Sequence, residues 1–230
     1  MKSLIFDAGP IISLATNNLL WILKPLKKEF NGNFYITKAV KSELVDMPLE
    51  TKKFKFEAIQ VEKQIETGIL KIMSAQDIFA QAQELQTKAN NLFEANRQSL
   101  NIVQLGEMEG LAASILYETE AFVTDERITR LLVEKPLALK NLLEKRLHTK
   151  IKISEELLSE FEKKVRHTTI IRSVELVTVA YEEGLLDKFI VKLPNPKKEL
   201  LEGILWGLKL NGCGISEQEI EEILKMEAHR

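Results

Sequence analysis

The chain opens on Ser3-Leu-Ile-Phe-Asp7-Ala-Gly-Pro-Ile-Ile-Ser13-Leu, an apolar run that ends on an aspartate and gives way to turn residues and a second apolar run. The first run predicts a buried strand and the second predicts a helix. In α/β folds ligands bind beyond the carboxyl ends of parallel strands, so Asp7 is placed for a ligand or a metal ion. An aspartate before Ala-Gly-Pro can equally cap the next helix or begin a turn. Asp7 taken alone does not decide between these interpretations.

Apolar segments and helix-forming segments alternate along the rest of the chain. Such alternation is typical of a three-layer α/β/α fold with a mostly parallel sheet, here of about five strands. The expected strands are residues 2–6, 34–36, 68–73, 121–124 and 168–171. The expected helices are 11–30, interrupted near Pro25, then 38–45, 50–66, 75–105, 107–118, two charged stretches within 126–167, and 173–183.

The length of 230 residues favours one main domain with an appendage. The clearest connector is Lys192-Leu-Pro-Asn-Pro-Lys197, which divides a domain at 1–191 from a C-terminal helical extension at 192–230. Ser216, with Glu219 three residues later, predicts a capping box at the start of the second helix of this pair. The charged segment at about 128–167 is interpreted as a helical insertion into the main domain.

Composition limits the kinds of metal site that the chain can build. With Cys213 as the one cysteine, neither an intrachain disulfide nor a cysteine-rich zinc site can form. Cys213 itself is expected to be an inert loop thiol. The three histidines, at 148, 167 and 229, are dispersed along the chain. Any metal must therefore be held mainly by oxygen ligands, which favours Mg²⁺ or Mn²⁺.

Charge and hydropathy say less about partners and location. The formal net charge of −2 gives no global sign of a polyanion partner. Local basic clusters at 24–28, 127–130 and 163–167 can be solvated helix faces or phosphate-binding tracks. Apolar runs are too short to cross a bilayer and no signal-peptide pattern is present, so we expect a cytoplasmic protein without membrane association.

Four carboxylates form one predicted constellation. Asp7 and Asp125 each end a predicted strand, and Glu43 and Glu107 lie early in helices that return to the same edge of the sheet. Acids that converge in this way repel one another unless cations compensate their charge. Bound Mg²⁺ or Mn²⁺ would activate water and stabilise the charge that develops when a phosphodiester is attacked in line. Hydrolysis of a nucleic-acid backbone is the reaction class that suits this arrangement.

The segments that carry these acids resemble the PIN-domain family. They are Leu4-Ile-Phe-Asp7-Ala-Gly-Pro, Tyr35-Ile-Thr-Lys-Ala-Val-Lys-Ser-Glu43-Leu, Gly106-Glu-Met-Glu-Gly-Leu-Ala-Ala113 and Phe122-Val-Thr-Asp125-Glu. The resemblance covers about residues 1–191, and 173–225 is similar to the helical tail of a prokaryotic branch of the family. It implies a metal-dependent endoribonuclease, often the toxin of a toxin-antitoxin pair, with Asp7, Glu43, Glu107 and Asp125 as catalytic metal ligands. It also implies an RNA substrate, an antitoxin protein as partner, and a homodimer.

Neighbouring residues receive weaker assignments. Thr37 and Thr124 flank the motifs and are candidates to support the site by hydrogen bonds. Glu109 and Glu126 are candidate auxiliary acids, although Glu109 lies about 200° around the helix from Glu107, so the two are not expected to face the same metal. Many PIN domains have Asp where Glu107 stands, and the longer side chain would shift or loosen one metal ion.

Basic and aromatic residues near the motifs leave alternatives open. Arg127 and Arg130 can receive a phosphate or lie on the surface of a helix, and Arg172 can pair with a site acid. Trp21 and Trp206 are interpreted as core or interface aromatics and not as base-stacking platforms. The insertion can cover the crevice, carry RNA-binding lysines or bind a partner. A PIN-like fold without catalysis, acting as an RNA- or protein-binding module, is the alternative function.

Overall fold

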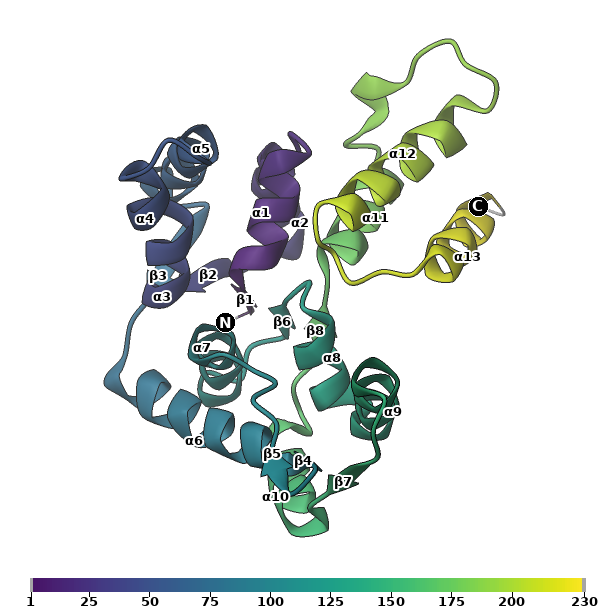
Figure 1. Cartoon of the computed structure of the whole chain (residues 1–230). Helices are drawn as coiled ribbons and strands as arrows, with labels where there is room; N and C mark the ends of the chain where they lie inside the picture. The colour runs from purple at the N-terminus through teal and green to yellow at the C-terminus, as the bar shows by residue number, and fades with distance from the viewer. Residues whose placement is uncertain (1, 229–230) are drawn as a thin grey trace.

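The computed structural model describes residues 2–228, and its centre is a sheet of five parallel strands (Figure 1). Across the sheet the strands run β3 (Leu70–Met73), β2 (Asn33–Thr37), β1 (Ser3–Phe6), β6 (Ala121–Val123) and β8 (Ile170–Ile171). Leu4 of β1 is in register with Phe34 on one side and with Ala121 on the other. The predicted α/β class and five-stranded parallel sheet are confirmed.

Alternation along the strands gives the sheet two buried faces. Leu4 and Phe6 pack into one hydrophobic core, whereas Ile5 between them packs into a second core on the opposite face. The same alternation divides Phe122 of β6 from its neighbours Ala121 and Val123. Successive side chains of a strand point to opposite faces, so helices must cover both sides of this sheet.

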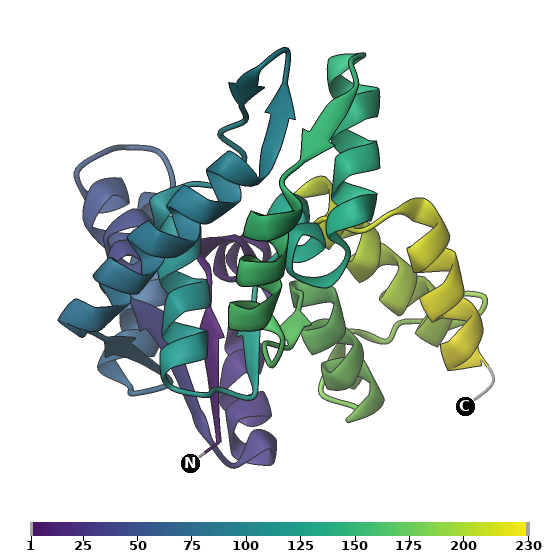
Figure 2. The same cartoon turned by 90° about the horizontal axis from the view of Figure 1, so that it is seen from below.

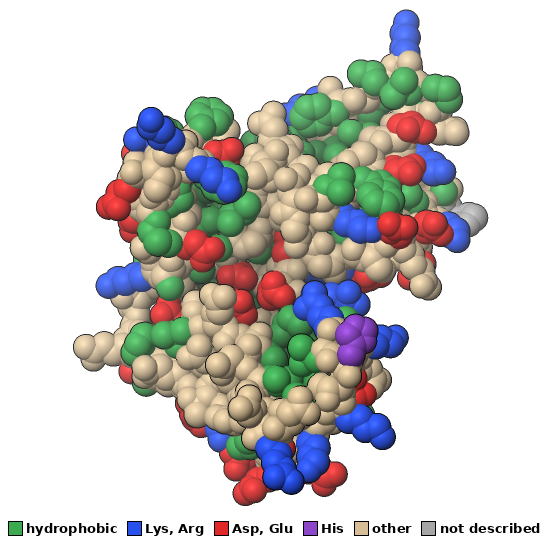
Figure 3. Space-filling view, in the orientation of Figure 1, with side chains coloured by type: hydrophobic (Ala, Val, Ile, Leu, Met, Phe, Trp, Pro, Cys, Tyr) green, Lys and Arg blue, Asp and Glu red, His purple; other side chains and the backbone are tan. Residues whose placement is uncertain are grey.

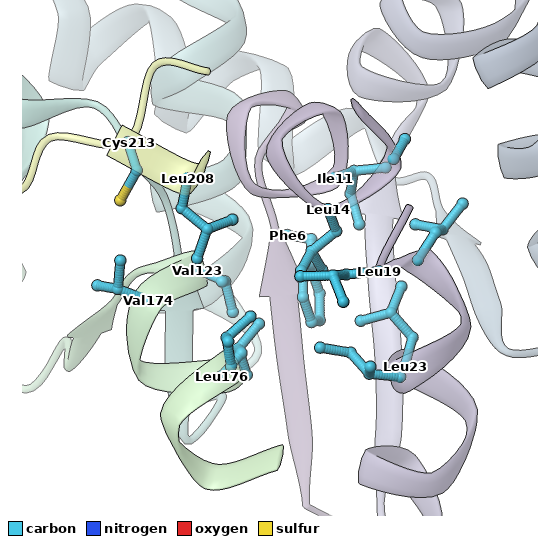
Figure 4. Close-up of a cluster of buried hydrophobic side chains, with 14 of the residues drawn as sticks. Phe6, Ile11, Leu14, Leu19, Leu23, Val123, Val174, Leu176, Leu208 and Cys213 are labelled. Carbon is cyan, nitrogen blue, oxygen red and sulfur yellow. The ribbon is translucent and has the colours of Figure 1, made fainter. Parts of the chain in front are cut away.

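The first core is covered by helices from both ends of the chain (Figure 4). They are α1 (Ala8–Thr16), η1 (Leu20–Ile22), α2 (Leu23–Phe30), α3 (Lys38–Lys41), the π-helical turn η2 (Ser42–Asp46), α4 (Met47–Leu49), α5 (Lys55–Glu66), α11 (Ser173–Glu182) and η3 (Asp187–Phe189). Figure 4 shows Phe6 and Val123 of the sheet among Ile11, Leu14 and Leu176 of the covering helices.

The second core lies under helices from the middle of the chain. These are α6 (Gln76–Leu92), α7 (Leu105–Leu116), α8 (Arg127–Glu134), α9 (Pro136–Leu147) and α10 (Glu155–Val165). Gly110 lets α7 approach β6 closely, because a Cβ at that position would lie 2.5 Å from the ring of Phe122. The close packing of α7 fixes the position of the acids near its N-terminus.

A small antiparallel sheet lies beyond the second core, in the order β5 (Gln98–Ser99), β4 (Phe93–Ala95) and β7 (Ile151–Ile153). It is visible at the top of Figure 2. The predicted helix over 75–105 is therefore wrong after Leu92, because buried Phe93 pairs with Ile153 in this sheet. The two predicted helical stretches within 126–167 are three helices and a strand.

Two predicted helix breaks also lie elsewhere. The helix expected over 11–30 ends at Thr16, where Asn18 adopts a left-handed conformation with φ 57°, whereas Pro25 lies within the first turn of α2, where a missing N–H costs nothing. Gly106 was expected to precede a helix, but it lies inside α7.

The C-terminal helices α12 (Pro196–Leu210) and α13 (Glu217–Ala228) lie beside α11. Three leucines of α12, at 201, 205 and 208, are fully buried in the first core. The predicted capping box is confirmed, since the Ser216 hydroxyl accepts from the Glu219 amide at 3.2 Å and the Glu219 carboxylate accepts from the Ser216 amide at 2.8 Å. No helix within residues 2–228 combines the length and apolarity needed to cross a bilayer.

Candidate functional site: an acidic crevice at the switch point of the sheet

The candidate site lies where the order of the strands reverses. The chain runs outward from β1 through β2 to β3, then returns to the other side of β1 to form β6 and β8. In open parallel sheets ligands bind in the crevice at this reversal, beyond the carboxyl ends of the strands. Asp7 and Asp125 both follow strands at this point, and Figure 3 shows acidic side chains gathered near the centre of this face.

Asp7 is buried, and it caps α1. Its Oδ1 accepts a hydrogen bond from the Ala8 amide at 2.8 Å, and its Oδ2 accepts one from the Thr124 hydroxyl at 2.9 Å. Burial, together with the charges of Glu43 and Asp125, raises the pKa of Asp7 from 3.8 to about 6, against the effect of the two hydrogen bonds. Capping and membership of an acidic cluster are therefore compatible at Asp7.

Glu107 is the second carboxylate of the crevice. Burial raises its pKa from 4.5 to about 7, and the negative charge of Asp7 contributes in the same direction. The hydroxyl of Thr129, a buried residue of α8, donates to Glu107 Oε2 at 3.0 Å. A partly desolvated carboxylate whose pKa is raised further by a neighbouring acid is a common feature of functional sites.

Glu109 faces a different direction from Glu107. Burial raises its pKa, while hydrogen bonds from the Thr37 hydroxyl and the Ala39 amide lower it. Thr37 also caps α3, since its Oγ1 accepts from the Val40 amide at 3.2 Å. Glu109 therefore joins α7 to the beginning of α3, and the prediction that Glu107 and Glu109 face different partners agrees with this geometry. Thr37 thus caps the N-terminus of α3 and also contacts Glu109.

Glu43 lies at the edge of the crevice. It is exposed, and it belongs to the π-helical turn η2, a kind of distortion that is frequent at functional sites. Its charge contributes to the raised pKa of Asp7. Glu43 is thus electrostatically coupled to Asp7 while its carboxylate remains accessible to solvent.

Asp125 has a different environment from Asp7. It is buried, its Oδ1 accepts from the Ser173 amide at 2.8 Å, and its Oδ2 accepts from the hydroxyls of Ser13 at 2.7 Å and Ser173 at 2.8 Å. The carboxylate therefore joins α1 to the first residue of α11. Its backbone carbonyl accepts from the Gly214 amide at 3.0 Å, where a Cβ on residue 214 would lie 2.9 Å from that oxygen.

The arginines predicted near the site point mostly toward the C-terminal helices. Arg172 pairs with Glu175 and Glu219 at 2.6 and 2.8 Å, so the predicted alternative of pairing with a site acid is not what the structure has. Arg130 lies 3.7 Å from Glu219 and donates to the Gly214 carbonyl at 3.3 Å. Arg127 is exposed.

Three further residues have clearer positions. Glu126 caps α8, since its Oε1 accepts from the Ile128 amide at 3.1 Å, and its charge reaches Glu107. The Cys213 thiol is buried, and burial raises its pKa to about 12, in keeping with an inert thiol. His229 lies outside the described residues.

The donor chemistry of Asp7 and Glu107 fits a hard divalent cation. Mg²⁺ is usually held by one or two carboxylates together with waters and substrate phosphates, and ionised oxygens in a repulsive pair gain from a cation between them. Within residues 2–228, however, no three acidic, histidine or cysteine side chains are grouped closely enough to hold one ion. The prediction that Asp7, Glu43, Glu107 and Asp125 all bind metal stays a prediction.

Sequence reasoning missed the hydroxyls that organise this crevice: Ser13, Thr129 and Ser173. All three are almost completely buried, at 1%, 0% and 0% exposure, within otherwise apolar helical surroundings. A polar residue on the apolar face of a helix was the available signal, since buried hydroxyls require a partner.

Comparison with protein-family models, with curated proteins and with solved structures found no match to this chain. The function is therefore argued from the crevice itself.

Proposed function

We propose that this chain is a Mg²⁺- or Mn²⁺-dependent endoribonuclease of the PIN-domain type. The observation that carries the proposal is the pair Asp7 and Glu107, a buried and a half-buried carboxylate with pKa values raised to about 6 and about 7 at the switch point of a parallel sheet. Burying two acids side by side is unfavourable for stability. A function that requires negative charge at this point accounts for that cost.

Within this proposal each residue has a distinct role. Asp7 and Glu107 would hold the metal, which supplies an activated water and neutralises charge on the phosphodiester. Thr124 and Thr129 fix the orientation of these two carboxylates through their hydroxyls. Glu43, exposed at the edge of the crevice, would complete the ligand set when RNA binds. Asp125 fixes α1 and α11 around the crevice through its hydrogen bonds with Ser13 and Ser173.

Cleavage of end-labelled RNA, single-stranded and structured, tests the proposal. We expect cleavage in Mg²⁺ or Mn²⁺ that is lost on chelation and falls at least about 100-fold in Asp7→Asn and in Glu107→Gln. Glu109→Gln is a matched control, because Glu109 lies on the same helix but bonds to Thr37 and Ala39, and it should retain most of the activity. Equal cleavage by the wild type and Asp7→Asn would contradict the proposal.

A non-catalytic RNA- or protein-binding module is the second candidate. It is favoured by the state of Asp125, whose oxygens are already engaged by Ser13 and Ser173, and by the lack of a three-acid group in the described chain. Calorimetric titration with Mn²⁺ separates the two candidates. Mn²⁺ binding by the wild type that disappears in Asp7→Asn supports the nuclease. If Mn²⁺ produces no heat of binding, either with or without RNA present, the result supports the module.

The toxin role, the antitoxin partner and the homodimer belong to the same proposal and rest on the family resemblance. Forced expression should arrest growth, and a small protein encoded beside this chain should relieve the arrest. Unimpeded growth on expression of a folded, cleavage-competent chain would contradict the toxin role. Sedimentation of the purified chain measures the oligomeric state directly.

A further inference from the structure

A short segment beside the crevice alternates lysine and phenylalanine. From the turn after α4 into the first two residues of α5 the chain reads Thr51-Lys-Lys-Phe-Lys-Phe56, which we call the basic-aromatic loop. Its lysines are all exposed, and the rings of Phe54 and Phe56 are 48% and 68% exposed. Figure 3 shows basic and apolar side chains side by side over α4 and α5. Large aromatic rings in such positions lose hydrophobic free energy unless something covers them.

The loop is held in a defined shape. The Thr51 hydroxyl donates to the carbonyls of Pro48 at 3.1 Å and Lys53 at 3.0 Å. Phe54 has φ 59°, a left-handed conformation that a bulky side chain rarely adopts. The ammonium of Lys53 lies 4.7 Å from the centre of the Phe54 ring. The backbone thus keeps an aromatic ring and a cation together at the surface.

The basic-aromatic loop adjoins Glu43 at the edge of the acidic crevice. Phe54 and Glu43 line the same small cavity, of about 60 Å³, together with Ile12, Leu44 and Val61. The charge of Glu43 in turn reaches Asp7. A chain-like ligand that lies on the loop therefore passes beside Glu43, the residue whose charge acts on Asp7.

We propose that the basic-aromatic loop binds single-stranded RNA and guides it past Glu43 into the crevice. This inference rests on the proposed function for the choice of RNA. Lysines neutralise phosphates, and exposed aromatic rings stack on unpaired bases without sequence preference. A duplex hides the faces of its bases from Phe54 and Phe56, so the loop selects single strands. The three positive charges of Lys52, Lys53 and Lys55 outnumber the two negative charges of the flanking Glu50 and Glu57.

Binding is measured apart from cleavage by fluorescence anisotropy of a labelled oligouridylate, with the full chain carrying Asp7→Asn in the presence of chelator. In this background Phe56→Ala should weaken binding about 5-fold or more, since about 5-fold is the smallest loss expected when one base no longer stacks on an aromatic ring. Phe79→Ala is the control, because Phe79 on α6 is an exposed phenylalanine (48%) outside the loop, and the substitution should leave binding unchanged.

The lysines are tested by salt dependence. Affinity falls with salt, and each phosphate contact on a single strand contributes about 0.7 to the magnitude of the slope of log affinity against log salt. The double variant Lys52→Gln/Lys55→Gln removes two such contacts, so the magnitude of the slope should fall by about 1.4. Lys24→Gln with Lys28→Gln, two exposed lysines on α2, should leave the slope unchanged. Single-stranded DNA should show the same losses, since the shared chemistry is phosphate and unpaired base.

Three outcomes would overturn the inference: loop variants that bind as tightly as their background, duplex RNA that binds as tightly as single strands, or an acidic peptide that binds the loop more tightly than the oligouridylate. These are distinct from failure of the proposed function. Cleavage by the wild type with no effect of the loop variants rejects the loop alone. Loop-dependent binding without any cleavage rejects the nuclease and leaves the loop as a binding surface.

Discussion

Asp7 and Asp125 follow neighbouring strands of one sheet and both are buried, yet their hydrogen bonds and neighbouring charges differ. Asp125 accepts three hydrogen bonds, from Ser13 and Ser173, that together join two helices. Asp7 accepts two hydrogen bonds, lies beside Glu107 and Glu43, and has a pKa raised to about 6. One strand-then-acid pattern in the sequence thus produces a structural carboxylate in one case and an under-compensated one in the other.

The two environments have opposite consequences for stability. A buried carboxylate that is fully hydrogen-bonded contributes to stability, whereas one whose own pKa is raised by burial and neighbouring charges reduces it at neutral pH. Natural proteins keep such destabilising groups chiefly where a function requires them. By this criterion we propose Asp7 and Glu107 as the functional pair, and Asp125 as the residue that holds the crevice in shape.

The largest effect on stability is expected from Asp125→Ala. The substitution leaves the Ser173 amide and the two hydroxyls buried without an acceptor, so we expect a loss of about 3–5 kcal/mol in the free energy of unfolding. Urea unfolding measures it. Ser13→Ala removes a single hydrogen-bond donor and should lower the free energy of unfolding by about 1 kcal/mol. If Asp125→Ala lowers it by no more than that, the structural role of Asp125 is contradicted.

Stability should fall as pH rises from about 4 to 7. The folded protein holds protons on Asp7 and Glu107 more tightly than the unfolded chain does, because their pKa values are raised, so the favourable contribution is present at low pH and lost as pH passes 6 and 7. Raising the pKa of Asp7 from 3.8 to about 6 corresponds to about 3 kcal/mol of the free energy of unfolding. The Glu219 carboxyl titrates in a separate window, because burial raises its pKa but hydrogen bonds from Ser216 and Arg172 lower it to about 2.

The check on this pH dependence is urea unfolding of the wild type and Asp7→Asn at several pH values. The variant should have a distinctly flatter profile between pH 4 and 7. Identical profiles would show that Asp7 does not titrate in this range.

A divalent cation should reverse part of this loss. At a Mn²⁺ concentration about ten times its Kd, stabilisation of the wild type by about 1.4 kcal/mol is expected at pH 7.5, with much less at pH 5, where the pair is largely protonated. Thermal unfolding with and without Mn²⁺ measures the effect. Stabilisation that persists in Asp7→Asn would place the cation elsewhere.

Thr124→Val should have a small effect, about 1 kcal/mol, with a specific signature. Removing the hydroxyl that donates to Asp7 Oδ2 takes away an interaction that favours the ionised carboxylate, so the pKa of Asp7 should rise above its value in the wild type. Carbon-detected NMR titration of the Asp7 carboxyl reports the shift. A lowered pKa would contradict the assigned hydrogen bond.

Much of the fold could be predicted from the sequence, because the five strands and their covering helices follow from local hydropathy. The small sheet could not, since Phe93 and Ile153 pair across sixty positions and the strands β4 and β7 that carry them are only three residues long. The order of the acids predicted a shared crevice. It did not predict that Asp125 is saturated by hydroxyls from α1 and α11, because such partners come from tertiary packing.

The most direct test of the contrast is the urea unfolding of two matched variants, Asp7→Asn and Asp125→Asn, at pH 7.5. Both replace a buried carboxylate by its neutral isostere. We predict opposite signs: Asp7→Asn gains about 1–3 kcal/mol because a repulsive, desolvated charge is removed, and Asp125→Asn loses about 1–2 kcal/mol because charge-assisted hydrogen bonds are weakened. Destabilisation of both variants, or a gain in Asp125→Asn, would contradict the account.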